Sequence, residues 1–240
     1  QLAWLAAALF GVHPAGAETV NYIIQRGDLY VVLAIAAGVA LYAWLPDQRR
    51  FGLYLVPPFL GMLAKPPALI FPLVLLVYIV LFDRRDRPAS AGSAPKRRGN
   101  RRAPEPLRTT LLAAKEPWTA CVRRIVPALL LTAFCVLLEK AMTSAHFFAT
   151  RGSAFDYVIT QPYIALRYFR SFFWPLYLSA DTDLKPFESP WNAPAAAGFL
   201  FLALLVAAAI RTARKQEWHP VSFGLWWFFI GLLPTSVYPL

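Results

Sequence analysis

Residues 11–28 read GVHPAGAETVNYIIQRGD and separate two apolar runs, Gln1–Phe10 and Leu29–Leu45. This polar stretch carries four ionisable side chains: His13, Glu18, Arg26 and Asp28. Pro14 has a fixed φ and no N–H, so a helix arriving through the first run is predicted to end at His13. Ionisable groups between two such runs must leave the hydrocarbon or face a cavity lined by water or protein. We interpret the stretch as the floor of a polar site at the mouth of a helical membrane bundle.

The composition is typical of a polytopic membrane protein. Hydrophobic residues make up 58% of the chain, charged residues 15%, and the mean hydropathy is +0.47. A transmembrane helix needs about 20 apolar residues, so 240 residues with one long polar loop predict an all-α bundle of about six or seven crossings. The net charge of +11 would suggest a nucleic-acid partner in a soluble protein. An excess of cations in cytoplasmic loops explains it here, and we expect no nucleic acid.

Seven apolar segments are the candidate crossings: Gln1–Val12, Leu29–Leu45, Phe51–Ala64, Ala68–Phe82, Ile125–Leu138, Ala195–Ile210 and Val221–Leu233. The chain lacks an initiator Met, begins inside one apolar run and stops after another. We therefore expect a fragment of a longer protein, with membrane segments before Gln1. Cys121 and Cys135 lie beside or within apolar runs, which predicts reduced thiols rather than a disulfide framework.

Two long connections differ in character. Residues 83–124 hold 12 Lys and Arg against 4 Asp and Glu, and the centre of this connection, residues 85–107, is predicted to be disordered. We interpret it as a basic cytoplasmic loop near anionic lipid, with nucleic-acid binding as the alternative. Residues 141–194 form an aromatic-rich, nearly neutral outer loop. Its aromatic residues recur at helical spacing with Arg167 and Arg170 on the other side, which predicts an amphipathic helix lying in the membrane interface.

The distribution of cations predicts the orientation. The side that contains Arg49, Arg50 and the basic loop carries 17 Lys and Arg, whereas the opposite side carries 7. The richer side is predicted to be cytoplasmic. The polar stretch, Lys65 and the aromatic loop then share the outer face. We find no internal repeat, so an inverted-repeat transporter has no support.

Four cations lie on the predicted outer side, where the positive-inside rule expects few: Arg26, Lys65, Arg167 and Arg170. One interpretation is a clamp for the phosphate of a lipid-linked substrate, because Arg binds phosphate through two N–H groups and Lys acts as a point charge. The alternative is that they snorkel to outer headgroups, or that Arg26 pairs with Glu18 or Asp28. Both interpretations stay open at this point.

Two further polar groups could take part in chemistry. His13 and Glu18 could act as an acid–base pair or bind metal. Residues five apart do not lie on the same face of a helix, however, which favours a capping or interhelical hydrogen-bond role. Asp181 and Asp183 could hold a divalent ion or supply a base, or serve as turn residues before Pro186. No Gly-rich phosphate loop, nucleophile elbow, CxxC or HExxH pattern is present. No cofactor is indicated, a divalent metal remains possible, and no residue is assigned as the catalytic base.

Four ordered segments resemble one family. HPAGAETVNYIIQRGDLY, residues 13–30, is similar to the second outer loop of the transmembrane-and-tetratricopeptide O-mannosyltransferases and their bacterial relatives. LAKPPALIFPLVLL, residues 63–76, resembles that family's Ser/Ala-Lys-Pro entry into a helix. QPYIALRYFRSFFWPLYLSADTD, residues 161–183, resembles its interfacial stretch, and WWFFIGLLPTSVYPL, residues 226–240, its closing helix. Two features depart from the family: the long basic cytoplasmic loop, and Tyr238 where an apolar residue is more usual.

This resemblance implies a GT-C type membrane glycosyltransferase of the bacterial inner membrane with a periplasmic active face. Such enzymes transfer a sugar from a polyprenyl-phosphate donor, with inversion, to an acceptor hydroxyl that is often on a protein. The catalytic carboxylate would lie in a first outer loop before this sequence, and tetratricopeptide repeats would follow it. The matched positions are His13, Glu18, Arg26, Asp28, Lys65, Gln161, Arg167 and Asp181. The rival hypotheses are a flippase or transporter of lipid-linked cargo, and a non-catalytic anchor for a scaffold domain.

Overall fold

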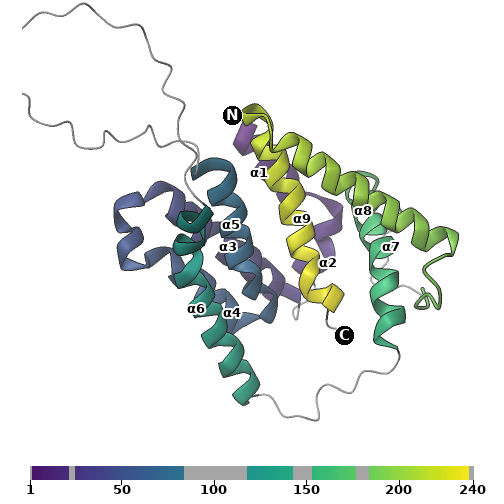
Figure 1. The fold of residues 1–240 in the computed structure, drawn as a ribbon, viewed down its shortest axis with the longest axis horizontal. Helices are drawn as coiled ribbons and strands as arrows, with labels where there is room; N and C mark the ends of the chain where they lie inside the picture. The colour runs from purple at the N-terminus through teal and green to yellow at the C-terminus, as the bar shows by residue number, and fades with distance from the viewer. Residues whose placement is uncertain (1, 22–24, 84–117, 143–152, 177–183, 238–240) are drawn as a thin grey trace, which may run out of the picture.

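The computed structural model describes residues 2–21, 25–83, 118–142, 153–176 and 184–237. Every regular element within these ranges is a helix, which confirms the all-α prediction (Figure 1). Helices coincide with all seven predicted apolar segments. Four helical segments are long and apolar enough to cross a membrane: Arg26–Trp44, Pro66–Asp83, Trp118–Met142 and Ala193–Thr212. The apolar helix over Leu53–Ala64 is shorter.

The polar stretch is a chain of short turns between two helices. Helix α1 (Leu2–Gly11) ends close to the predicted end at His13. The 3₁₀ turn η1 (Pro14–Gly16) and the short helix α2 (Ala17–Asn21) follow. Proline suits the first position of such a turn because its missing N–H would have no partner there. Helix α3 (Arg26–Trp44) then begins with Asp28 in its first turn, where a carboxylate is favoured by the helix dipole.

The core forms where α3 meets the segments that follow it. These are η3 (Pro46–Phe51), η4 (Leu53–Leu55), α4 (Val56–Ala64), η5 (Pro66–Ile70), α5 (Phe71–Tyr78) and the π-helical turn η6 (Ile79–Asp83). Phe71, Leu75 and Ile79 are fully buried in it. Gly38 allows α3 to pack closely against α4 and α5, because a Cβ there would lie 2.5 Å from Cγ of Pro58 and 2.9 Å from Cε2 of Phe71.

Helix α6 (Trp118–Met142) corrects one predicted boundary. Residues 118–124 were expected to belong to the cytoplasmic loop, with the crossing starting at Ile125. They form the first turns of α6 instead. Packing stabilises these turns, because Cys121 is buried against the core. Hydropathy marks the apolar part of a helix, whereas hydrogen bonding continues through the flanking polar residues. At the other end of the predicted loop, Asp83 is the last residue of the π-helical turn η6, and residues 84–117 lie outside the described residues.

The predicted amphipathic helix is confirmed as α7 (Ala154–Phe173). It packs along α8 (Ala193–Thr212) and α9 (His219–Val237) (Figure 1). The Tyr157 hydroxyl donates to the Thr235 carbonyl, and the Phe169 ring lies 5.6 Å from that of Phe228. These two contacts show that α7 and α9 run antiparallel. The 3₁₀ turn η8 (Gln216–Trp218) connects α8 to α9.

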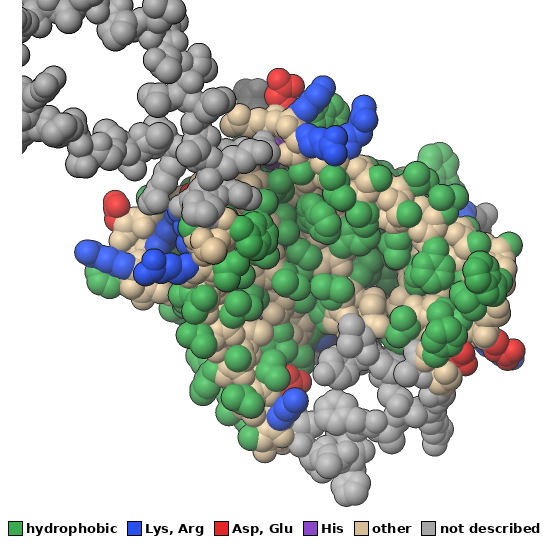
Figure 2. All heavy atoms as spheres, in the orientation of Figure 1, with side chains coloured by type: hydrophobic (Ala, Val, Ile, Leu, Met, Phe, Trp, Pro, Cys, Tyr) green, Lys and Arg blue, Asp and Glu red, His purple; other side chains and the backbone are tan. Residues whose placement is uncertain are grey.

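Large apolar side chains are exposed along these helices. Figure 2 shows hydrophobic side chains covering most of one face, with cationic groups gathered near its margins. Leu33 of α3, Leu130 of α6 and Leu204 of α8 are each more than 60% exposed. An exposed apolar surface of this extent indicates that the medium around these helices is itself apolar. Together with the four long apolar helices, it indicates a membrane protein.

Candidate functional site

Two of the predicted site residues form an ion pair. Lys65 lies between α4 and η5 in an extended conformation (φ −160°, ψ 136°), which the following Pro66 favours. Its Nζ donates to Oδ2 of Asp28 across 2.7 Å. The Lys65 side chain also runs past Gly27, where an added Cβ would lie 3.4 Å from Cδ of the lysine. The two side chains are 33% and 39% exposed, so the pair contributes no more than about 1 kcal/mol of stability.

Arg26 precedes Asp28 by two residues and bonds to a different group. It is exposed, and its Nε donates to the Val20 carbonyl across 3.0 Å. Val20 lies in the last turn of α2, where carbonyl groups lack helical partners, so Arg26 satisfies one of them. The observed partner of Asp28 is Lys65 and that of Arg26 is the Val20 carbonyl, in place of the alternative pair of Arg26 and Asp28. Glu18 lies in α2, and its side chain is outside the described residues.

His13 joins the polar stretch to the far end of α7. Its ring stacks on Phe172 with centroids 4.6 Å apart and planes 13° apart. Its Nε2 lies 2.8 Å from the Phe172 carbonyl. A carbonyl only accepts, so Nε2 carries the proton in this contact. This is the interhelical hydrogen bond considered for His13, and the described residues contain no group of three potential His, Cys, Asp or Glu metal ligands.

The remaining candidates lie on or after α7. Arg167 and Arg170 are exposed on α7, and Arg170 is within one turn of the Phe172 contact. Gln161 donates through Nε2 to the Tyr157 carbonyl within the same helix, at 3.5 Å. Asp181 and Asp183 lie outside the described residues. In the described part of the chain, the candidates thus lie in two groups, one around Asp28 and Lys65 and one around His13.

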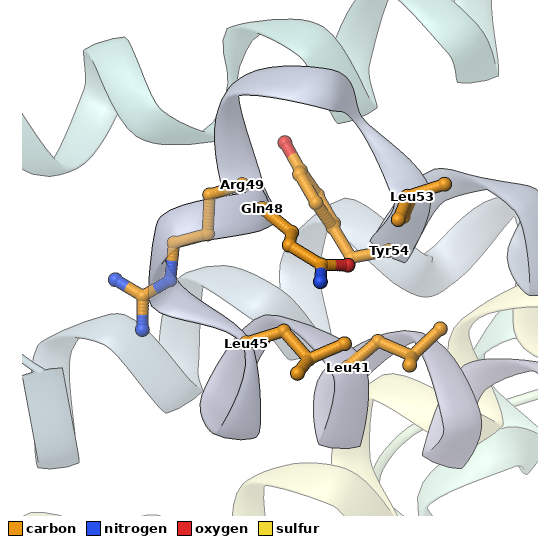
Figure 3. A pocket seen from close by; sticks show the side chains of 6 residues that line it. All are labelled: Leu41, Leu45, Gln48, Arg49, Leu53 and Tyr54. Atoms are coloured by element: carbon orange, nitrogen blue, oxygen red, sulfur yellow. The ribbon is translucent and has the colours of Figure 1, made fainter.

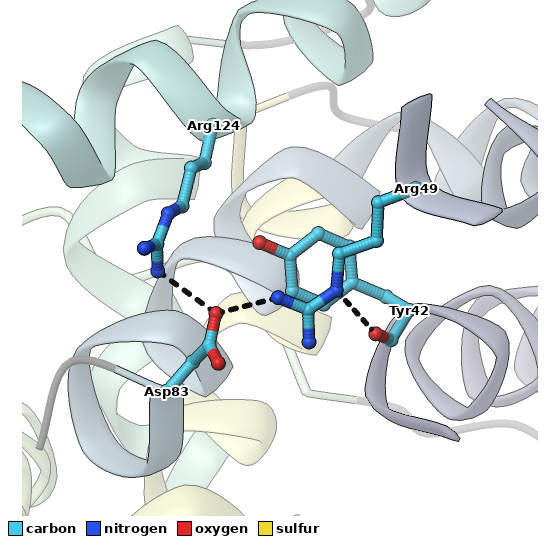
Figure 4. Close-up of polar contacts among 4 residues, drawn as sticks. All are labelled: Tyr42, Arg49, Asp83 and Arg124. Atoms are coloured by element: carbon cyan, nitrogen blue, oxygen red, sulfur yellow. Dashed lines mark hydrogen bonds and ion pairs between the residues drawn. The ribbon is translucent and has the colours of Figure 1, made fainter. Parts of the chain in front are cut away.

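A second polar network was missed by the sequence analysis. Oδ2 of Asp83, at the end of η6, accepts from Nη1 of Arg49 at 2.9 Å and from Nη1 of Arg124 at 2.8 Å (Figure 4). Arg49 also donates through Nε to the Tyr42 carbonyl, and its guanidinium lies 3.9 Å from the centre of the Tyr42 ring. No local pattern signals it, because Asp83 lies 34 residues from Arg49 and 41 residues from Arg124. This network joins α3, η3, η6 and α6 at one end of the bundle.

A small hollow lies beside this second network. It is a shallow surface depression rather than an enclosed cavity, and it is lined by Leu41, Leu45, Gln48, Arg49, Leu53 and Tyr54 (Figure 3). Helix α3 separates it from Asp28, because Leu41 and Leu45 lie at the end of α3 opposite to that carboxylate. The hollow therefore belongs to the end of the bundle away from Lys65.

Comparisons with known proteins leave the family open. No protein-family model, curated protein or solved structure matches this chain. The membrane-protein class stands on the four long apolar helices. We therefore argue a more specific function from the contacts described above and from the resemblance of the four segments.

Proposed function

We propose that this chain forms part of a GT-C type membrane glycosyltransferase. It would transfer a sugar from a polyprenyl-phosphate donor to an acceptor hydroxyl, on a protein in the favoured case. The observation that carries the proposal is the ion pair between Asp28 and Lys65, which joins two of the four resembling segments across the bundle. The excess of cations in the connections assigned to the opposite side of the membrane supports a periplasmic position for this pair in a bacterial inner membrane.

The other resembling segments meet through aromatic contacts. His13 of the first segment stacks on Phe172 of the third. Phe169 of the third segment contacts Phe228 of the fourth, with ring centroids 5.6 Å apart. Segments that are far apart in the sequence are thus linked one to the next in space. Such linkage is what a shared site built from all four would need, and it supports the proposal.

The chemistry fits cations held in this way. When the glycosidic bond breaks, negative charge develops on the departing polyprenyl phosphate, and fixed cations stabilise that charge. Lys65 has three N–H donors, of which Asp28 engages one. Arg26, two residues before Asp28, donates through Nε to the Val20 carbonyl, which leaves its other N–H groups for a ligand. Arg26, Lys65 and Asp28 together carry a net charge of +1, so the group favours an anion.

Helix α7 offers a route for the lipid part of the donor. Phe172, Phe173 and Trp174 are exposed at its C-terminal end, where His13 is also anchored. Aromatic side chains at such positions contact acyl or prenyl chains while polar groups stay near water. Arg167 and Arg170 on the same helix would face the headgroup. No metal and no catalytic base is part of this proposal.

Replacing Lys65 tests the proposal. In membranes that contain the full-length protein, Lys65→Ala is expected to lower sugar transfer from polyprenyl-phosphate mannose by about 100-fold, the effect of losing one stabilising donor at a developing oxyanion. Lys65→Arg should restore part of the activity, because it keeps the charge. The measurement is the initial rate of radiolabelled mannose transfer at equal protein level.

The matched control is Lys185→Ala, which removes an exposed lysine before α8 and should leave the rate unchanged. Unchanged transfer by Lys65→Ala at normal protein level would contradict the proposal and favour a non-catalytic anchor. Movement of the lipid-linked sugar across the membrane without transfer would contradict it in favour of a transporter.

A further inference from the structure

The turn η3 and the start of α6 carry more positive than negative charge. Their four arginines are Arg49, Arg50, Arg123 and Arg124, and the acids beside them are Asp47 in η3 and Asp83 in η6. Four positive and two negative charges leave a surplus of two. Asp83 is the carboxylate that both Arg49 and Arg124 contact, and all three side chains are 20% to 25% exposed. The partly buried Arg49, Arg124 and Asp83 leave one positive charge, and the exposed Arg50, Arg123 and Asp47 leave another. Such a surplus of positive charge favours a bound anion.

Apolar and aromatic side chains border these cations. Trp44 is 80% exposed and Phe51 is 66% exposed, at the two ends of η3. The guanidinium of Arg50 lies 4.6 Å from the centre of the Phe51 ring. The hollow lined by Leu41, Leu45 and Leu53 lies directly beside Arg49 (Figure 3). Exposed aromatic residues next to arginines are typical of the level at which lipid headgroups meet acyl chains.

We propose that η3 and the start of α6 bind the phosphate headgroup of an acidic phospholipid. Arg49, Arg50 and Arg124 would contact the phosphate, and the acyl chain would lie along Phe51 and the leucines of the hollow. The shared chemistry is a phosphate anion, which free phosphate also supplies. The bordering apolar side chains favour the lipid, because free phosphate would leave them exposed to water. Figure 2 shows cations gathered at the margin of the apolar face near η3, as such a site requires.

Asp83 holds the arginines in position for this ligand. A single oxygen, Oδ2, accepts from both guanidinium groups, so Arg49 and Arg124 are drawn toward the same point (Figure 4). The Tyr42 carbonyl and ring fix Arg49 from the other side. Arginines held in this way lose less conformational entropy when they bind an anion. The site lies at the opposite end of α3 from Asp28, so it is independent of the proposed donor site.

Native mass spectrometry of the purified full chain tests this site. The protein is released from mixed micelles that contain phosphatidylglycerol or phosphatidylcholine, and retained lipid is counted. We expect phosphatidylglycerol to be retained preferentially, and Arg50→Gln to weaken its retention about fivefold, the effect of one cation near a charged membrane surface. Arg50 is exposed and lies outside the Asp83 network, so this variant should fold. The matched control, Arg214→Gln, removes an exposed cation after α8 and should retain the lipid.

Asp83→Asn separates a lipid site from a purely structural network. Asparagine keeps a side-chain oxygen that can accept from both arginines, and it removes one negative charge. A folded variant is therefore expected to retain phosphatidylglycerol at least as well as the wild type. Equal loss of lipid in Arg50→Gln and Arg214→Gln would overturn the proposal, because it would indicate diffuse attraction. A rise in melting temperature with inorganic phosphate equal to that with phosphatidylglycerol would also overturn it, in favour of a phosphate-ion site.

Discussion

Gly198→Ala is expected to destabilise the bundle by about 2 kcal/mol or more. An added Cβ would lie 2.4 Å from the backbone N of Tyr163 and 2.5 Å from the carbonyl carbon of Pro162. Backbone atoms cannot rotate away as a side-chain end can, so α7 and α8 must separate. Overpacking of this kind costs about 1–3 kcal/mol, occasionally more. The measurement is the free energy of unfolding from a titration of SDS into dodecylmaltoside micelles.

Gly224→Ala is the matched control for this prediction. It also adds a methyl group inside a helix, α9, but no atom beyond the helix's own neighbouring backbone lies within 4 Å of the added Cβ. Alanine is favoured over glycine in helices by about 1 kcal/mol, so this variant should be as stable as the wild type or slightly more stable. A loss of stability equal to that of Gly198→Ala would show that close helix contact is not the cause.

Phe71→Ala is expected to lower the free energy of unfolding by about 3 kcal/mol. Phe71 is fully buried at the start of α5, and its ring faces Gly38 of α3. Removing a buried phenyl ring leaves a cavity, and the usual cost is about 3–5 kcal/mol. We expect the lower end of that range, because in a membrane the phenyl ring moves between the protein interior and lipid rather than water. The free energy of that transfer is smaller. The same SDS titration measures the change.

Phe134→Ala provides the comparison for Phe71. This phenylalanine of α6 is 55% exposed, so lipid or detergent can fill the space that its ring leaves. Its loss should cost less than about 1 kcal/mol by the rule that substitutions away from the core have small effects. If both variants lost equal stability, the core assignment around Phe71 would be wrong.

The positions of the helices could be predicted from hydropathy alone. The crossing predicted at Leu29–Leu45 is the helix Arg26–Trp44, and that at Ala195–Ile210 is the helix Ala193–Thr212. Apolar runs mark these helices because the backbone must satisfy its own hydrogen bonds in lipid. The start of α6 could not be predicted in this way, since Arg123 and Arg124 interrupt the hydropathy and the helix continues through them to Trp118.

For the candidate site, the sequence could predict only that its residues lie near the same surface of the membrane. The cation count placed Asp28 and Lys65 on one face, but their pairing depends on how α3 and α4 pack, which the sequence does not display. Asp83 was missed for the same reason. It is 34 residues from Arg49 and 41 from Arg124, and no local pattern links residues so far apart.

The π-helical turn η6 gives the end of α5 two different neighbours. Phe82 faces α9, with its ring centroid 5.8 Å from that of His219, while the adjacent Asp83 reaches the arginines of η3 and α6. Each residue advances a helix by about 100°, so deleting one residue here would swing both side chains away from their partners. Chain length within Ile79–Asp83 is therefore as tightly constrained as the identity of the residues, although the turn lies at the edge of the bundle.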